Sequence, residues 1–95
     1  MAKNPATAAQ HRYLDRVSQL PCSCCGADAP SLVHHLRDGQ GMSDRASHWL
    51  TISLCYECHG AYLGSQGVHG DKSLLRIYKL SEVDLLANTI ELLNT

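Results

Sequence analysis

Four cysteines are arranged as two C-x-x-C pairs, the spacing at which one tight turn presents two thiolates to a metal ion. The pairs are Cys22 with Cys25, and Cys55 with Cys58. Four thiolates complete the tetrahedral coordination that Zn²⁺ prefers, so the pattern predicts a structural zinc site that stabilises the fold. Cys24 could replace Cys22 as a ligand, but the glycine after Cys25 favours Cys22.

The histidines form a second group that could do chemistry, because five of the six lie between positions 34 and 69. Neighbouring residues of a strand point to opposite sides, so His34 and His35 cannot easily bind one metal ion together. One can bind a cation while the other acts as a general base, a role that suits an imidazole near neutral pH. A histidine pair alone is usually only part of a polar surface. This pair gains significance from His59, which directly follows Cys58 and would be positioned by the zinc site.

These side chains need helices and strands to position them, and the sequence pattern predicts both. The expected order is a helix over residues 7–20, strands over 31–36 and 49–54, a helix over 56–63, a helix over 73–80 and a last helix from 81 onward. Thr7 with Gln10, and Ser81 with Asp84, have the spacing of residues that cap a helix N-terminus. Residues between these elements are rich in glycine and other turn formers.

Three sets of apolar residues are predicted to face the core. In the second strand they alternate at Leu50, Ile52 and Leu54. In the short helix after the glycine-rich loop they are Leu74, Leu75 and Tyr78. In the last helix they form a stripe of Val83, Leu86, Ala87, Ile90 and Leu93.

The chain has 95 residues, a net charge of −1, no phenylalanine and a single tryptophan. This length predicts one domain, spanning residues 1–95, whose core is marginal without a metal or another crosslink. The near-neutral charge excludes a strongly basic, non-specific DNA-binding protein. The sequence shows neither a signal-peptide pattern nor an apolar stretch that could cross a membrane, so we expect a cytoplasmic protein with reduced, metal-binding cysteines.

The combined pattern resembles the HNH, or ββα-metal, nuclease superfamily over residues 22–60. The matching features are the first C-x-x-C pair, then His34-His35, then Leu54-Cys55-x-x-Cys58-His59. The resemblance implies a small α+β, zinc-stapled fold. Its ββα-metal core, residues 22–70, would follow an N-terminal helical region, 1–20, and precede C-terminal helices, 71–95.

Over about residues 22–90 the sequence looks like phage and prophage HNH proteins of the Ref type, which are RecA-dependent nucleases of recombination. The similar runs are HHLRDGQGM at 34–42, RASHWLTI at 45–52, GVHGD at 67–71 and the helix containing Leu85-Leu86-Ala87. This similarity implies a metal-dependent DNA endonuclease that is prophage-encoded and linked to recombination. DNA would be its substrate and the RecA filament a partner.

The resemblance also implies a role for each histidine. His34, His59 and His69 would hold one catalytic divalent cation (Zn²⁺, Mg²⁺, Mn²⁺ or Ni²⁺), and His35 would be the general base. The sequence departs from the superfamily pattern in two respects. His69 lies ten residues after His59, farther than in simpler members. The middle asparagine is absent, so His48 is the candidate for orienting the catalytic site, and a surface histidine beside Trp49 is the alternative interpretation.

Arg37, Arg45 and Lys72 are candidates for contacts with DNA phosphates, and a solvated surface is the alternative interpretation. On a helix, Lys72, Arg76 and Lys79 would share one face. A non-catalytic zinc module that binds DNA or protein is the alternative to a nuclease, and the small size and near-neutral charge modestly favour that module. The sequence does not predict the oligomeric state.

Overall fold

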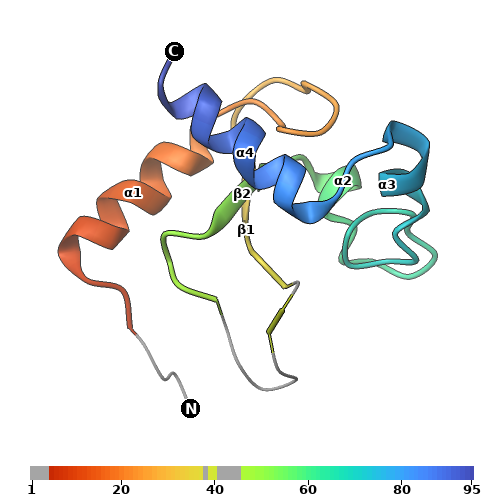
Figure 1. The fold of residues 1–95 in the computed structure, drawn as a ribbon, viewed down its shortest axis with the longest axis horizontal. Coiled ribbons are helices and arrows are strands. Elements are labelled where there is room, and N and C mark those ends of the chain that lie inside the picture. The colour runs from red at the N-terminus through yellow and green to blue at the C-terminus, as the bar shows by residue number, and fades with distance from the viewer. Residues whose placement is uncertain (1–4, 38, 41–45) are drawn as a thin grey trace.

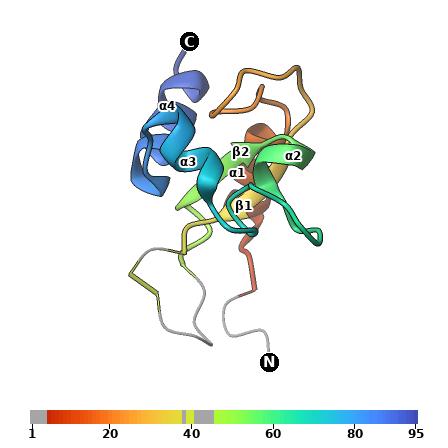
Figure 2. The same cartoon turned by 90° about the vertical axis from the view of Figure 1, so that its right-hand side faces the viewer.

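The computed structural model describes residues 5–37, 39–40 and 46–95, which form an α+β structure (Figure 1). The elements are α1 (Ala8–Ser18), β1 (Leu32–His35), β2 (Thr51–Leu54), α2 (Tyr56–His59), α3 (Ser73–Tyr78) and α4 (Glu82–Leu93). The two strands lie in the middle of the molecule, with α1, α4 and α2 around them (Figure 2). The predicted order of helices and strands is confirmed, although each element is shorter than predicted. None of the described helices is long and apolar enough to cross a membrane.

β1 and β2 form an antiparallel sheet in which His34 lies opposite Ile52 and His35 lies opposite Thr51. In β1 His34 is buried, whereas Val33 and His35, whose side chains leave on the other face, are half-buried. Since successive side chains of a strand leave on opposite faces, the two adjacent histidines face different surroundings.

Strand β2 is buried along its whole length, because α1 and α4 both pack against it. The sequence predicted alternate burial, and Ile52 and Leu54 do lie in the core. Thr51 and Ser53, on the alternate positions, are fully buried as well. Ser53 can be buried because its hydroxyl donates a hydrogen bond to the carbonyl of Pro21 at 2.9 Å.

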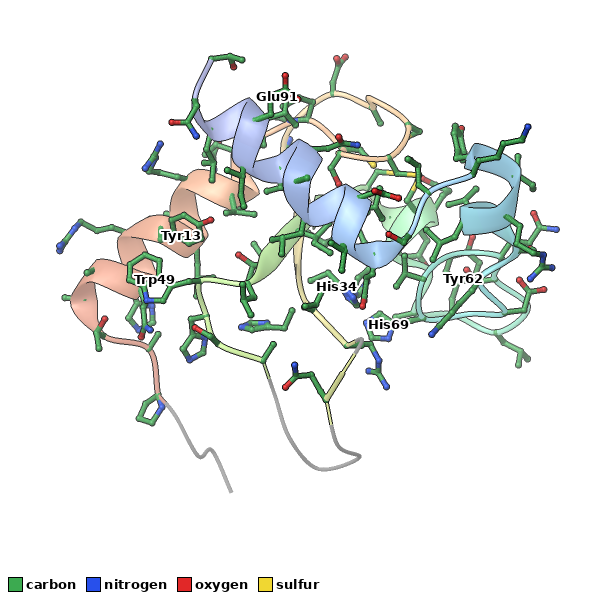
Figure 3. The ribbon with its side chains drawn as sticks, in the orientation of Figure 1. Tyr13, His34, Trp49, Tyr62, His69 and Glu91 are labelled. Atoms are coloured by element: carbon green, nitrogen blue, oxygen red, sulfur yellow. The ribbon has the colours of Figure 1, made fainter. Side chains whose placement is uncertain are left out.

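Helix α1 begins at the predicted capping box, in which the side chains of Thr7 and Gln10 each accept a hydrogen bond from the other residue's backbone N–H. Near the middle of the helix, Tyr13 packs edge-to-face on Trp49, with the ring centroids 4.9 Å apart (Figure 3). This contact fixes α1 against the segment that leads into β2.

The buried face of α4 differs in part from the predicted one, although Leu86 packs against the core as predicted. The capping box of Ser81 and Asp84 is confirmed, but Val83 and Ile90, which were predicted to face the core, are 54% and 44% exposed. The buried residues are instead Glu82, Leu85 and Thr89. The two polar members of this face hydrogen-bond to the strands, and these bonds explain why the helix is rotated away from its apolar stripe.

Helix α2 ends at His59, whereas the sequence predicted a helix through residue 63. It ends because Gly60 adopts a left-handed conformation with φ +64°. A Cβ at Gly60 would lie 2.7 Å from the Cα of Gly67, so the chain after the helix returns to contact it closely.

Helix α3 also departs from the prediction. Its two leucines pack against the core as expected, but Tyr78 is 45% exposed. Lys72 and Lys79 flank the helix in left-handed conformations, so the helical geometry expected to align them with Arg76 does not apply.

The hydrophobic core and the predicted zinc site are one unit. The buried cluster consists of Cys22, Ile52, Leu54, Cys58, Val68 and Leu85. Two of these residues belong to the C-x-x-C pairs, so a metal ion bound there would brace the centre of the fold.

Candidate metal centres

The four cysteines of the C-x-x-C pairs lie together, with all four sulfur atoms within 4.8 Å of one another. Cys25 Sγ and Cys55 Sγ, from different pairs, are 3.7 Å apart. Within each pair a backbone N–H points at a sulfur, from Cys25 to Cys22 and from Cys58 to Cys55, each at 3.5 Å. This arrangement can hold a metal ion such as Zn²⁺.

Electrostatics of the cysteine cluster favour a bound cation. Burial raises the pKa of the Cys58 and Cys55 thiols, because little water is present to solvate their charged forms. Burial also acts on Cys22, but hydrogen bonds from the backbone, that of Cys25 foremost, outweigh it and lower its pKa to about 7. Four ionised thiols so close together would repel one another, and a divalent cation removes that repulsion.

The second cluster consists of His34 on β1, His59 at the end of α2 and His69 in the following loop. Their ligand nitrogens all lie within 4.8 Å of one another. His34 Nδ1 is 3.1 Å from His69 Nε2, and the rings of His59 and His69 have centroids 4.5 Å apart. Figure 3 shows His34 and His69 side by side, below the N-terminal end of α4. Three imidazoles at this separation can share one metal ion.

The loop after α2 explains how His69 reaches the cluster in spite of its distance along the chain. The backbone N–H of Val68 donates to the carbonyl of Cys58, and that of His69 donates to the carbonyl of His59. These two bonds pair the loop with the last turn of α2, residue by residue. Because the chain returns to contact Gly60 closely, the rings of His59 and His69 are in contact although the two residues are ten positions apart in the sequence.

The three histidines of this cluster favour their neutral forms. Burial lowers the pKa of His34, His59 and His69, since each would be charged in a poorly solvated position. A neutral imidazole has a nitrogen lone pair to offer a metal ion. The donor set therefore fits a divalent cation near neutral pH.

His35 lies on the opposite face of β1 and contacts a different histidine. Its Nε2 is 3.0 Å from Nδ1 of His48, and the ring centroids are 5.1 Å apart. His48 is 7% exposed, so this contact is largely shielded from water. The structure thus brings together the residue predicted as general base and the residue predicted to orient it.

Glu82, the first residue of α4, is a member of this region that the sequence did not indicate. Its Oε2 lies 2.6 Å from His34 Nε2, and its Oε1 accepts a hydrogen bond from the backbone N–H of Arg37 at 2.9 Å. An acidic residue directly after a helix cap is common, because it interacts favourably with the helix dipole. Its position after Ser81 therefore carried no signal of a contact with a histidine far away in the sequence.

A family of proteins described as recombination enhancement, RecA-dependent nucleases matches residues 6–94 of the chain. The chain belongs to this family. The match extends over both clusters, and the predicted similarity to RecA-dependent nucleases is confirmed. Searches among curated proteins and solved structures found no match. The family description implies a DNA substrate and a functional relation to RecA.

Two of the three cations predicted to contact DNA phosphates, Arg37 and Lys72, lie near the histidine cluster. Burial has the largest effect on the pKa of His69, and the charges of Arg37 and Lys72 lower it further. Both side chains are exposed and able to meet a ligand. Arg45, the third candidate, lies outside the described residues.

Proposed function

We propose that this chain is a metal-dependent DNA endonuclease of the HNH, or ββα-metal, type that acts in RecA-linked recombination. The observation that carries the proposal is that two adjacent histidines, His34 and His35, have different contacts. His34 contributes to a cluster of three imidazoles, while His35 contacts a separate histidine on the other face of the strand. A hydrolytic site needs both a cation to stabilise charge and a base to activate water.

His34, His59 and His69 would hold the catalytic cation, and the four cysteines would hold a structural Zn²⁺. When bound, the cation would stabilise negative charge on the phosphate and on the leaving 3′ oxygen. Imidazole ligands suit Zn²⁺, Ni²⁺ or Mn²⁺, and Mg²⁺ would depend more on oxygen ligands from the substrate. Three protein ligands are the number found in catalytic zinc sites, in contrast to four in structural ones.

His35 would take a proton from the attacking water. When His35 Nε2–H donates to His48 Nδ1, the basic lone pair of His35 is on its Nδ1. His48 would thus select the tautomer and hold the ring, which is the orienting role proposed for it in place of the missing asparagine.

The substrate would be contacted by Arg37, Lys72 and Arg45. With a net charge of −1, the domain would bind DNA weakly alone, because affinity for DNA comes largely from neutralised phosphates. Recruitment by a RecA filament would compensate for that weakness. This partner would place the protein in the cytoplasm, and a prophage origin rests on the motif resemblance alone.

The test compares His35→Ala with His11→Ala, which removes an exposed histidine of α1. Cleavage of a D-loop substrate is measured with and without RecA, at fixed divalent cation. We expect His35→Ala to lose about 10²–10⁴-fold in cleavage rate and His11→Ala to retain the wild-type rate. Circular dichroism and bound zinc should be unchanged in both variants.

Two results would count against the proposal. Undiminished cleavage by His35→Ala would exclude this residue as the base. Loss of folding in His35→Ala would instead favour the non-catalytic zinc module, in which the histidines are structural. Equal cleavage with and without RecA would leave the nuclease proposal intact but remove the filament as its partner.

A further inference from the structure

We infer that Glu82 is a positioning residue that orients His34 and supplies negative charge to the histidine centre. This inference rests on the proposed function, since it concerns the metal centre of that function. Glu82 would not itself bind the cation. It would act through His34, by holding one ring nitrogen so that the other faces the cation.

The contacts of His34 assign a task to each of its nitrogens. Nε2 lies 2.6 Å from the Glu82 carboxylate, whereas Nδ1 lies 3.1 Å from His69 Nε2, inside the cluster. A carboxylate only accepts hydrogen bonds, so the Nε2 must carry the proton and the lone pair must be on Nδ1. The contact with Glu82 therefore fixes the tautomer that can bind a metal ion through Nδ1.

Burial makes this contact strong and specific. His34 is 2% exposed and Glu82 is 4% exposed, so water does not compete with either group. The second carboxylate oxygen is held by the backbone N–H of Arg37, which fixes the orientation of the carboxylate. A metal-bound histidine is commonly supported in this way, and the supporting group tightens metal binding.

Charge gives Glu82 a second effect. Three neutral imidazoles leave the full charge of a divalent cation uncompensated in a partly buried site. The Glu82 carboxylate, which contacts a ligand of the cation and not the cation itself, offsets part of that charge. The interaction is strong because water is scarce.

Helix α4 brings Glu82 to this position without contributing a metal ligand. The capping box of Ser81 and Asp84 sets the first turn, so that Glu82 is the first helical residue and lies over β1. Farther along the helix, Thr89 accepts a hydrogen bond from the backbone of Ser53 on β2. Two polar anchors on opposite strands thus fix the rotation of the helix.

The test is a titration with Co²⁺, which reports on both metal sites by visible absorption. The wild-type protein is compared with Glu82→Gln and with Glu91→Gln, which removes the same charge from an exposed position of the same helix (Figure 3). Thiolate-bound cobalt absorbs far more strongly than imidazole-bound cobalt, so the cysteine site serves as an internal control for folding. We expect Glu82→Gln to weaken Co²⁺ binding at the histidine site by about 10-fold to 100-fold. Glu91→Gln should bind Co²⁺ as the wild type does.

A measurement on the wild-type protein tests the inference even where Glu82→Gln folds poorly. Nitrogen-15 NMR of the histidine rings should find His34 protonated at Nε2, and protonation at Nδ1 would overturn the inference. Equal Co²⁺ affinity in Glu82→Gln and wild type would also overturn it, while leaving the proposed function intact. Absence of a histidine-bound Co²⁺ in the wild type would refute the proposed metal centre and the role of Glu82 together.

Discussion

At the scale of single residues, the candidate site depends on two adjacent histidines whose contacts differ in kind. His34 lies between a carboxylate and another imidazole, whereas His35 contacts the imidazole of His48. The contacts of His34 suit it to bind a metal ion, because they leave an unprotonated ring nitrogen that faces the other histidines of the cluster. The contact with His48 holds one nitrogen of His35, so that the other nitrogen can act as the base.

Substitution of His48 tests the second contact. His48→Ala removes the group that lies 3.0 Å from His35 Nε2, so the base would lose its fixed orientation. We expect the cleavage rate to fall by about 10-fold to 100-fold, less than on removal of the base itself. His48→Asn should retain more activity, because its amide oxygen can also accept from the imidazole. The measurement is kcat across a pH series, and equal losses in the two variants would argue against an orienting role.

At the scale of elements, the loop after α2 decides whether the histidine cluster forms. Gly60 has a positive φ, and a Cβ there would meet both the Ser65 hydroxyl and the backbone of Gly67. Gly64 also has a positive φ, but a Cβ there would meet nothing within 4 Å. The two glycines therefore separate the effect of backbone conformation from the effect of close packing.

We predict that Gly60→Ala lowers the free energy of unfolding by about 2–4 kcal/mol, since conformational strain and a backbone clash both contribute. Gly64→Ala should cost only about 1–2 kcal/mol, from conformation alone. Urea unfolding at a fixed excess of zinc measures both values. Gly60→Ala should also weaken metal binding by the histidine cluster, because the clash displaces the segment that carries His69. Indistinguishable unfolding curves for the two variants would contradict the importance of the close return.

At the scale of the whole molecule, the cysteine cluster and the hydrophobic core depend on each other. A chain of 95 residues buries too little apolar surface for a secure core, and two of the four clustered cysteines are themselves core residues. Metal binding to thiolates in small domains is coupled to folding and contributes on the order of 10 kcal/mol. Zinc bound to the cysteines would thus also fix the positions of β1 and α2, the elements that carry His34 and His59.

We expect Cys58→Ser to lose bound zinc and cooperative unfolding together, and chelation of zinc from the wild type to have the same effect. Cys24→Ser is the matched control, because Cys24 is the fifth cysteine and lies outside the group of four that could share a metal ion. It should retain a full equivalent of structural zinc. Zinc content and thermal unfolding measure both variants, and loss of zinc in Cys24→Ser would show that Cys24 is a ligand.

The sequence by itself determined the features that depend on neighbours within a few residues. Both capping boxes, the order of helices and strands, and the opposite directions of His34 and His35 follow from local geometry and are confirmed. The two C-x-x-C pairs also indicated correctly which cysteines would lie together.

Only the tertiary structure decided the features that depend on contacts between distant segments. The apolar stripe predicted the buried face of α4 only in part: Leu86 packs against the core, but buried hydrogen bonds that Glu82 and Thr89 accept from the strands outweigh the exposure of Val83 and Ile90. In the same way, a close backbone contact, and not spacing along the chain, brings His69 to its partners. Local propensity determines whether a segment forms a helix or a strand, but contacts with distant segments determine which of its faces is buried.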